Sequence, residues 1–542
     1  MGVLHAGNTD LSTTIRQGGA MNSKKSARGT GGIRSFPGTA LLLFLLLCLT
    51  AGFQPPAMAD ARPRVAITIL HVNDTHGHIL PGIVKTVDPE WPVGGAAWLA
   101  QMIEDERAKN PKGTLLLSGG DMFQGTPVSN VFRGAPVTEI MNALAFDAMA
   151  IGNHEFDWGM DTLWRLRTAA RTPWLAANIV DGQGKALPGV KPWIITERKG
   201  IRIAVIGITT PETVWTTNPR NVAGLAFREP WDVLPAIIRE VRSQGAQLVV
   251  VLSHCGLDAD RKMAGEVAGI DVIVGGHSHT AVVDPVVVGK TVIVQAGCYG
   301  QYLGVLELSV DPESGRIEHF TDRKELKVVY SGPKDSFDPA IAGIVASYDD
   351  RIRDRFAAVI GSTEVDLKRY SRGESNLGNL IADAMRDTAK ADIALMNSGG
   401  IRTDIPRGAV TLEQLYTLLP FDNVLVSMDL TGRQLLQILE ESARGLHGIL
   451  QISGLRVTAD LTRPTGQRIV GVEIGGRPLA AEKMYRVVTN DFLAAGGDEF
   501  TGFREGNNVA YGDDIRDVAA AYLKKHSPVR PRIEGRIEVR GI

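Results

Sequence analysis

Residues 272–279, VIVGGHSH, carry a short apolar, β-branched run directly into two glycines and two histidines. Four other apolar runs in the first half of the chain end in polar residues in the same way. These polar ends are Asp74-Thr75-His76, Gly119-Gly120-Asp121, Gly152-Asn153-His154-Glu155 and Ser253-His254. In α/β sheets, ligand sites form outside the carboxyl ends of the strands. We therefore expect these side chains to converge, although they are far apart in the sequence.

The surrounding pattern indicates two α/β halves joined by a connector. The 542 residues exceed the usual domain size of about 100–200 residues, so two domains are expected. In 60–330, helical stretches alternate with buried-strand patterns, which is typical of an α/β core. These strands are expected at Ala66–Val72, Thr114–Leu117, Ile203–Ile208, Gln247–Leu252, Asp271–Val274 and Thr291–Val294.

The second half begins after a break in this pattern. Glycine and proline interrupt the chain at Ser331–Asp338, and Ile341–Phe356 then predicts an amphipathic helix, so 331–356 is taken as the connector. A second αβ unit is expected over 357–542. Its predicted elements include helices at Leu377–Thr388 and Leu412–Leu418 and a strand at Tyr485–Thr489.

Composition excludes several classes of protein. Hydrophobic residues make up 44% and charged residues 22%, values that exclude a disordered tail, a collagen-like fibre and a polytopic membrane protein. The formal charge of -2 lacks the basic excess that nucleic-acid binding by phosphate neutralisation needs. No nucleic-acid partner is expected, and the oligomeric state stays open.

Residues 1–59 are expected to be a signal peptide, and the stretch before Met21 is interpreted as an over-long start. Four basic residues between 24 and 34 precede the apolar stretch Ala40–Thr50, and Ala57-Met58-Ala59 resembles a cleavage site. The alternative, a membrane anchor, needs an apolar run of ~20 residues, longer than this one. A periplasmic or secreted protein, free of the membrane after cleavage, is therefore expected. Whether Cys255 and Cys298 pair there stays open.

The polar strand ends predict a metal centre. Each motif alone is more often turn chemistry, but seven of the eleven histidines lie between His71 and His279, and five of these follow strand patterns beside glycines. Imidazole combined with carboxylate suits Zn, Mn, Fe or Co better than Mg or Ca. A pair of divalent transition-metal ions is therefore predicted, whereas His71 and His78 are expected to be structural or to lie behind the ligands.

This set of motifs resembles the calcineurin-like metallophosphoesterases, in which the same patterns occur in the same order. The resemblance implies an α/β fold whose N-terminal part is an αββα sandwich. It assigns one metal to Asp74, His76 and His279 and the other to Asn153, His254 and His277, with Asp121 bridging the two. It also places His154 opposite the substrate.

The charge of this set fits a phosphate ester. Two divalent ions bring +4 and the two aspartates bring -2, which leaves about +2 for an anion such as a phosphate dianion. His154 lies three residues before Asp157, whose carboxylate could hold the imidazole protonated. We expect His154 and Asp157 to be catalytic, and Glu155 to make hydrogen bonds.

The second half resembles the C-terminal domain of 5'-nucleotidases, and with the first half it resembles bacterial periplasmic UDP-sugar hydrolase/5'-nucleotidases. The matching segments are 375–379, 397–402, 419–423 and 490–498. The resemblance implies a smaller α+β substrate-binding domain with two aromatic rings around a base. It assigns base stacking to Phe421 and Phe492, the sugar to Asp498, and phosphate to Arg372, Asn397 and Arg402.

The sequence therefore predicts a dinuclear metallohydrolase that cleaves nucleotides, with nucleoside 5'-monophosphates as the favoured substrates. UDP-sugar hydrolysis and 2',3'-cyclic-nucleotide phosphodiesterase activity are alternatives, because the same metals attack monoesters and diesters. Hydrolysis of a sulfur ester, or a non-enzymatic metal-stabilised binding module, is a more remote alternative.

Overall fold

A computed structural model describes residues 64–541 of the chain. The expected signal peptide, 1–59, lies outside the described residues. None of the helices within 64–541 has the length and apolar character that crossing a membrane would need.

The N-terminal domain is built on two β-sheets whose central strands are parallel. The first has the order β16-β15-β1-β4-β5-β6, with β17 paired to β15, and the second has the order β13-β14-β12-β11-β9-β8. The strands of the first are β1 Val65–Val72, β4 Thr114–Ser118, β5 Ala148–Ala150, β6 Trp174–Leu175, β15 Tyr302–Val310, β16 Ile317–Phe320 and β17 Leu326–Val328. Those of the second are β8 Trp193–Arg198, β9 Ile201–Thr209, β11 Leu248–His254, β12 Val272–Val274, β13 Val286–Val288 and β14 Thr291–Val294.

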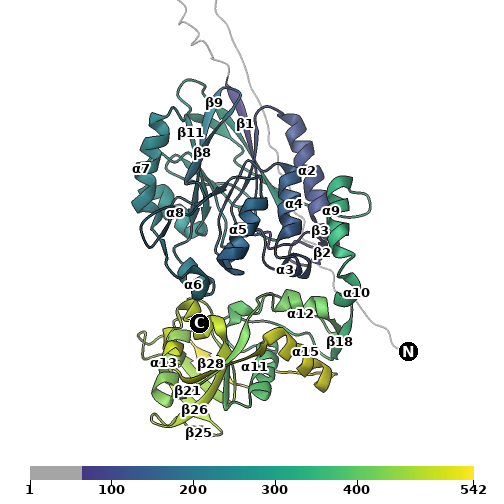
Figure 1. Cartoon of the computed structure of the whole chain (residues 1–542), viewed down its shortest axis with the longest axis vertical. Coiled ribbons are helices and arrows are strands. Elements are labelled where there is room, and N and C mark those ends of the chain that lie inside the picture. Colours follow the sequence, from purple (N-terminus) through teal and green to yellow (C-terminus); the bar gives the residue numbers. More distant parts are fainter. Residues whose placement is uncertain (1–63, 542) are drawn as a thin grey trace, which may run out of the picture. The chain divides into compact units, whose positions relative to one another are not determined.

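The central strands of this pair of sheets are apolar on both faces, which explains the continuous apolar runs in the sequence. One set of side chains, including Ile69, Leu117 and Val250, fills the space between the sheets. The opposite faces pack against helices α2 Ala96–Lys109 and α4 Ala135–Leu144 on one side, and α7 Pro230–Ser243 and α8 Leu257–Glu266 on the other. Figure 1 shows these helices on the two sides of the strands. The expected αββα sandwich is confirmed.

The connector is two helices, and the prediction of one continuous helix over Ile341–Phe356 was wrong. Helix α9 spans Pro339–Asp349 and α10 spans Arg353–Phe356. Between them, Ile352 has φ -124°, outside the helical range, and is 8% exposed. The turn thus lets both Ile352 and Phe356 reach the core of the N-terminal domain. The boundaries 60–330, 331–356 and 357–542 themselves stay a prediction.

The C-terminal domain has a five-stranded central sheet with the order β22-β19-β26-β21-β27. One face packs on α11, α12 and α15, and the other on α13 and a smaller sheet, β25-β24-β23-β28. The main elements are α11 Asn376–Ala389, β19 Ile393–Met396, α12 Leu412–Leu418, β21 Val424–Thr431, α13 Gly432–Ser442, β22 Gln451–Ser453, β23 Leu455–Asp460, β24 Ile469–Ile474, β25 Arg477–Pro478, β26 Met484–Asn490, β27 Asn507–Asp514, α15 Ile515–His526 and β28 Ile537–Arg540.

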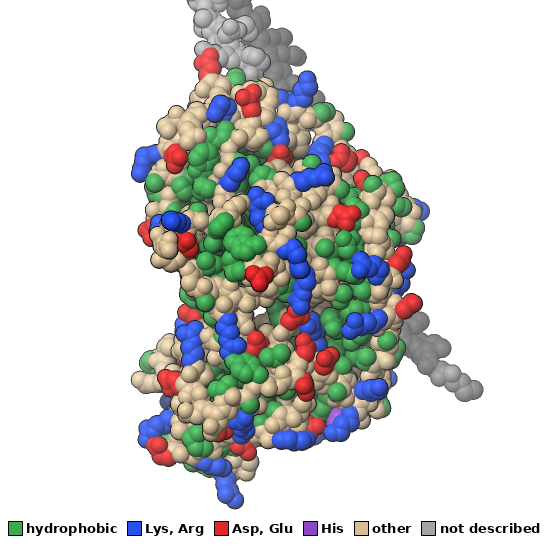
Figure 2. All heavy atoms as spheres, in the orientation of Figure 1, with side chains coloured by type: hydrophobic (Ala, Val, Ile, Leu, Met, Phe, Trp, Pro, Cys, Tyr) green, Lys and Arg blue, Asp and Glu red, His purple; other side chains and the backbone are tan. Residues whose placement is uncertain are grey.

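Shorter elements lie in the loops around these sheets. They are β2 Pro81–Val84, β3 Asp88–Gly94, α3 Pro127–Val131, η1 His154–Phe156, α5 Gly159–Ala169, β7 Ile179–Asp181, α6 Thr213–Thr216, η2 Pro219–Val222, β10 Leu225–Phe227, β18 Val359–Thr363, η3 Ser398–Gly400, β20 Gly408–Thr411, α14 Asp491–Ala494, η4 Gly497–Glu499 and η5 Thr501–Glu505. On the face seen in Figure 2, basic and acidic side chains are intermixed over both domains.

The two domains meet through specific polar contacts around the loops of both. Asn130 donates its side-chain amide to the carbonyl of Pro420 at 2.7 Å, and Asn218 donates to Asp491 at 2.9 Å. Arg133 forms an ion pair with Asp422. These contacts place loops of the C-terminal domain next to the carboxyl ends of the N-terminal strands.

A close approach between β1 and β15 gives a test of the sandwich. Gly304 lies opposite His71, whose Nε2 is 2.6 Å from Oε1 of Glu325, and a Cβ on Gly304 would lie 2.0 Å from that nitrogen. We expect Gly304→Ala to reduce the free energy of unfolding by about 1–3 kcal/mol through overpacking, measured by urea denaturation.

The control is Gly343→Ala in α9, where a Cβ would meet nothing within 4 Å. Alanine favours a helix over glycine by ~1 kcal/mol, so this variant should be unchanged or slightly more stable. Equal losses of stability in the two variants would contradict the proposed clash at His71.

Candidate active site

Five of the predicted metal ligands share an uncommon backbone conformation. The residues with φ between 47° and 73° include Asp74, His76, Asp121, His277 and His279. In non-glycine residues such left-handed conformations cost about 1–3 kcal/mol each and persist where the surroundings enforce them, commonly at functional sites. Here they turn the backbone sharply after β1, β4 and β12, so that the side chains of the three segments point toward one another.

Buried Glu155 holds in place the turn after β4 and the loop that follows β5. Its carboxylate accepts hydrogen bonds from the backbone N–H of Gly152 at 2.6 Å, Met122 at 2.8 Å and Asp121 at 2.9 Å. Burial, followed by the nearby Asp121 carboxylate, raises the pKa of Glu155 to about 7. Glu155 therefore braces the loops after β4 and β5, in keeping with the expectation that it makes hydrogen bonds.

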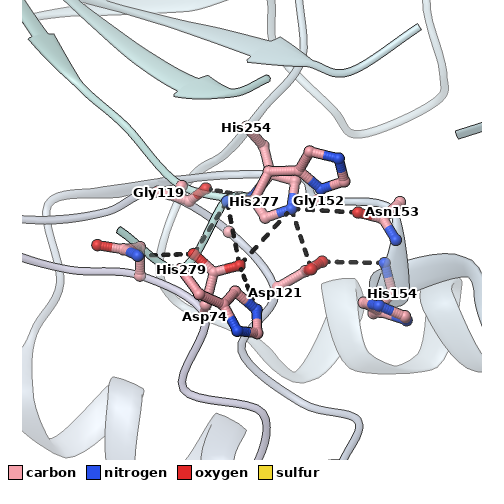
Figure 3. Close-up of polar contacts among 12 residues, drawn as sticks. Asp74, Gly119, Asp121, Gly152, Asn153, His154, His254, His277 and His279 are labelled. Carbon is pink, nitrogen blue, oxygen red and sulfur yellow. Dashed lines mark hydrogen bonds and ion pairs between the residues drawn. The ribbon is translucent and has the colours of Figure 1, made fainter. Parts of the chain in front are cut away.

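Asp74, His76 and His279 form the first cluster of potential ligands, with one ligand atom of each within 4.8 Å of the others. Nε2 of His279 lies 3.1 Å from Nε2 of His76 and 3.3 Å from Oδ1 of Asp74 (Figure 3). His76 uses its Nδ1 on the backbone carbonyl of Gln124, at 2.8 Å. This hydrogen bond fixes the tautomer and leaves Nε2 free for a metal.

The second cluster contains Asp121, His254 and His277. Nε2 of His254 lies 3.0 Å from Oδ2 of Asp121 and 3.2 Å from Oδ1 of Asn153, while its Nδ1 donates to the carbonyl of Gly119 at 2.7 Å. The structure thus brings all seven predicted ligands close together, and Figure 3 labels six of them, all except His76.

The donor set fits divalent metal ions. Two carboxylates, four imidazoles and one amide oxygen surround a largely buried space, and Asp121 approaches both clusters, with Oδ2 also 3.8 Å from Nε2 of His76. Nε2 of His277 lies 3.5 Å from the carboxylate of Glu212. Such outer contacts orient ligand histidines in metal sites. Sequence reasoning missed Glu212 and Gln124, because neither belongs to a recognisable motif.

His154 and Asp157 form a dyad beside these clusters. Nδ1 of His154 lies 2.6 Å from Oδ2 of Asp157, and the hydroxyl of Thr217 donates to the other carboxylate oxygen at 2.8 Å. Burial lowers the pKa of His154, but the carboxylates of Asp157 and Asp121 outweigh burial, and the pKa is raised overall. The imidazolium form is therefore favoured. Nε2 of His154 takes no part in the bond to Asp157 and is left to contact a bound substrate.

A cavity of about 710 Å³ extends from the metal clusters to the C-terminal domain. Phe421 and Phe492 are both half-buried and line this cavity, although Phe492 also packs against the core of the C-terminal domain. Phe421 stacks on His154 with ring centroids 5.6 Å apart, and the guanidinium of Arg402 lies 5.8 Å from the Phe421 ring. The aromatic wall of the cavity therefore touches the dyad directly.

Asn397 and Asp498 lie together on the same wall. The amide of Asn397 donates to Oδ2 of Asp498 at 3.0 Å, and its oxygen accepts from the amide of Asn490 at 2.9 Å. Burial raises the pKa of Asp498 to about 6. The amide of Asn397 thus orients the Asp498 carboxylate, and its predicted contact with phosphate stays a prediction.

Arg372, the predicted phosphate contact, does not line the cavity. Arg369 lines the wall, whereas exposed Arg372 is not among the lining residues. Both arginines lie in the loop before α11, whose path no periodic pattern specifies. Cavity residues that sequence reasoning missed include Arg133, Trp158, Asn218, Asn423 and Asp491.

The two cysteines, whose pairing the sequence left open, and the two histidines outside the predicted ligand set can also be placed. Cys255 and Cys298 are both free thiols. His71 pairs with Glu325 inside the first sheet, and His78 stacks on Tyr299 with ring centroids 4.1 Å apart. Neither histidine belongs to the two metal clusters described above.

Comparisons with known proteins agree with this architecture. The calcineurin-like phosphoesterase family model matches residues 67–281, and the model of the 5'-nucleotidase C-terminal domain matches residues 359–505. The chain is 31% identical over 574 residues to the snake venom 5'-nucleotidase of Crotalus adamanteus, with 95% of each chain covered. It is 29% identical over 531 residues to the trifunctional nucleotide phosphoesterase protein YfkN of Bacillus subtilis (strain 168), but spans only 35% of that protein.

A solved structure supports the same conclusion. The crystal structure of a 5'-nucleotidase precursor from Thermus thermophilus superposes with a TM-score of 0.81 at 36% sequence identity, covering 88% of this chain and 100% of that one. The two family models match the N-terminal and the C-terminal domain, in that order along the chain. The chain therefore belongs to the 5'-nucleotidase family of metal-dependent phosphoester hydrolases.

Proposed function

We propose that the enzyme hydrolyses nucleoside 5'-monophosphates to nucleoside and phosphate with the help of two divalent transition-metal ions. One observation carries this proposal: the metal clusters and the Phe421/Phe492 pair line a single cavity. A phosphate at the clusters would then lie within reach of a base held between the rings. A panel of nucleoside monophosphates, sugar nucleotides and 2',3'-cyclic nucleotides, assayed for released phosphate, tests the substrate.

Asp74, His76 and His279 are proposed to hold one ion, and Asn153, His254 and His277 the other, with Asp121 shared. Imidazole with carboxylate favours Zn, Mn, Co or Fe. When bound, such a pair of ions polarises phosphoryl oxygens and lowers the pKa of water, which is what ester hydrolysis needs.

The chain's own residues supply the remaining chemistry. Arg402 brings a permanent positive charge with several donors, suited to phosphate oxygens. His154, kept protonated by Asp157, donates from Nε2 to the oxygen that develops charge as the ester bond breaks. Arg369 is a second cation on the cavity wall and takes the place that sequence reasoning gave to Arg372.

The C-terminal domain is proposed to select the nucleoside. Base stacking on an aromatic ring is worth about 1–3 kcal/mol, and both Phe421 and Phe492 line the cavity. Asp498 accepts hydrogen bonds from ribose hydroxyls while Asn397 orients its carboxylate. The absence of a side chain at Gly497 leaves room for the Phe492 ring, because a Cβ there would lie 2.4 Å from that ring.

UDP-sugar and cyclic-nucleotide hydrolysis are the second candidate activities. A cavity of about 710 Å³ leaves room for a substituent beyond a mononucleotide, toward Arg133 and Trp158. A sulfur ester is a weaker candidate, because it would leave the aromatic pair and Asp498 without a role. The complete ligand set disfavours a module that binds metal without catalysis.

We also infer that the enzyme is periplasmic or secreted. The support is the basic, apolar and small-residue order of 21–59 in the sequence. N-terminal sequencing of the protein recovered from its host should begin at Asp60; retention of the apolar stretch would contradict export with cleavage.

Removing the imidazole of His154 should slow chemistry without releasing metal. We expect His154→Ala to lower kcat for AMP by about 10²-fold or more, the scale of losing one proton donor or transition-state contact. Metal analysis should give the same metal content as the unmodified enzyme. His319→Ala, an exposed histidine on β16, is the control and should keep full activity. Loss of metal from the His154 variant would instead make this residue a ligand.

Replacing both Phe421 and Phe492 by alanine should separate specificity from chemistry. Loss of stacking at ~1–3 kcal/mol per ring predicts a fall in kcat/KM for AMP of roughly 30-fold or more. Hydrolysis of a small aryl phosphate, which has no base, should change little. Equal losses on both substrates at an unchanged melting temperature would argue against the base clamp.

The pKa of Asp498, about 6, predicts a pH dependence of selectivity. Above this pKa the carboxylate is ionised and binds ribose hydroxyls more strongly; below it, protonation weakens those bonds. Since hydrogen bonds to charged groups exceed neutral ones by ~1 kcal/mol, the ratio of kcat/KM for AMP to that for the aryl phosphate should fall about fivefold as the carboxylate is protonated. In Asp498→Asn the ratio should be low at every pH; an unchanged pH profile in this variant would reject the assignment.

A further inference from the structure

We propose that Gln295 is a positioning residue that presets the loop 276–280, which carries His277 and His279 to the metal centre. This inference rests on the metal centre proposed above and adds a residue outside every predicted motif. Gln295 follows β14 directly and is completely buried, with 0% of its surface exposed. A buried amide at this point needs partners for both its oxygen and its nitrogen.

All of those partners lie in the loop that carries the two histidines. The oxygen of Gln295 accepts from the hydroxyl of Ser278 at 2.9 Å and from the backbone N–H of Thr280 at 2.7 Å. Its nitrogen donates to the carbonyl of Gly276, also at 2.7 Å. The three bonds bracket His277 and His279 in sequence, so one side chain holds both ends of the segment.

The loop needs such support because its backbone is strained. His277 has φ 73° and His279 has φ 54°, a region that residues with a side chain rarely adopt. Without the bonds to Gln295, the loop would be free to relax toward ordinary conformations. Both imidazoles would then leave the positions in which they face Asp74 and Asp121.

The same end of β14 also supports the first metal-binding loop. Asn73, 1% exposed, accepts from the N–H of Ala296 and donates to the carbonyl of Gly297, each at 2.7 Å. Its amide also donates to Oδ2 of Asp74 at 2.6 Å. Since β1 and β14 belong to different sheets, residues 295–297 form a common support for Asp74 and His279.

Two substitutions separate positioning from general stability. Gln295→Met keeps the length of the side chain but removes all three hydrogen bonds. Gln295→Glu keeps the acceptor for Ser278 and Thr280 and sets a carboxylate against the carbonyl of Gly276. The matched control is Gln247→Glu, a half-buried glutamine just before β11 that donates to Pro312 at 2.6 Å and accepts from Arg202 at 3.1 Å.

The full chain is stripped with a chelator, and Zn²⁺ binding is measured by competition with a chromophoric chelator. The thermal midpoint of each stripped protein is measured alongside. Loss of outer contacts to metal ligands typically weakens metal binding by about 10- to 100-fold, and we expect this for both Gln295 variants. Gln247→Glu should bind Zn²⁺ like the unmodified enzyme.

Unchanged Zn²⁺ affinity in a folded Gln295 variant would overturn the inference, even if its thermal midpoint falls, because Gln295 would then be only a structural brace. Should Gln295→Met not fold, the Gln295→Glu result decides alone. If the unmodified enzyme bound no Zn²⁺, the metal centre itself would fail for this ion. Zn²⁺ binding by the unmodified enzyme but not by the variants supports both proposals separately.

Discussion

The site depends on one constraint: five of the proposed metal ligands must stay in left-handed backbone conformations at the ends of parallel strands. These conformations let the loops that follow different strands turn toward a common point. The energy they cost is offset by buried hydrogen bonds, chiefly those that the carboxylate of Glu155 accepts and those that the side-chain amides of Asn73 and Gln295 make. The rigid double sheet beneath them makes that compensation possible, because its apolar strands fix where each turn begins.

The division of labour between the domains follows from this geometry. All residues of the metal clusters come from the N-terminal domain, whose strands hold them in place, whereas the aromatic rings and Asp498 come from loops of the C-terminal domain. The stack of Phe421 on His154 brings the two parts into direct contact. Hydrogen bonds such as that from Asn130 to Pro420 keep the loops of both domains facing the same cavity.

Much of this arrangement could be predicted from the sequence, because apolar strands and the polar residues after them leave a clear pattern. The strand at Thr291–Val294 and the helix at Leu412–Leu418 have the predicted limits, and the seven predicted ligands lie close together as expected. Long-range partners leave no such signal. Gln295 looks like an ordinary residue after a strand, and its importance becomes visible only when β14 lies beside the loop 276–280. The error in the connector has a physical cause of the same kind. The break at Ile352 depends on which side chains reach a core formed by distant residues, so amphipathic periodicity alone predicted a single helix. Arg369 and Arg372 differ by three positions in a loop, where no period fixes which side chain enters the cavity.

We propose that the seven ligands form one centre for two ions that act together on a nucleotide. The most direct measurement is a titration of the chelator-stripped enzyme with a divalent transition metal, with bound metal and phosphate release from AMP followed in parallel. We expect binding that saturates near two ions per chain, with activity rising as the second ion binds. Full activity with one ion bound, or with none, would contradict the claim.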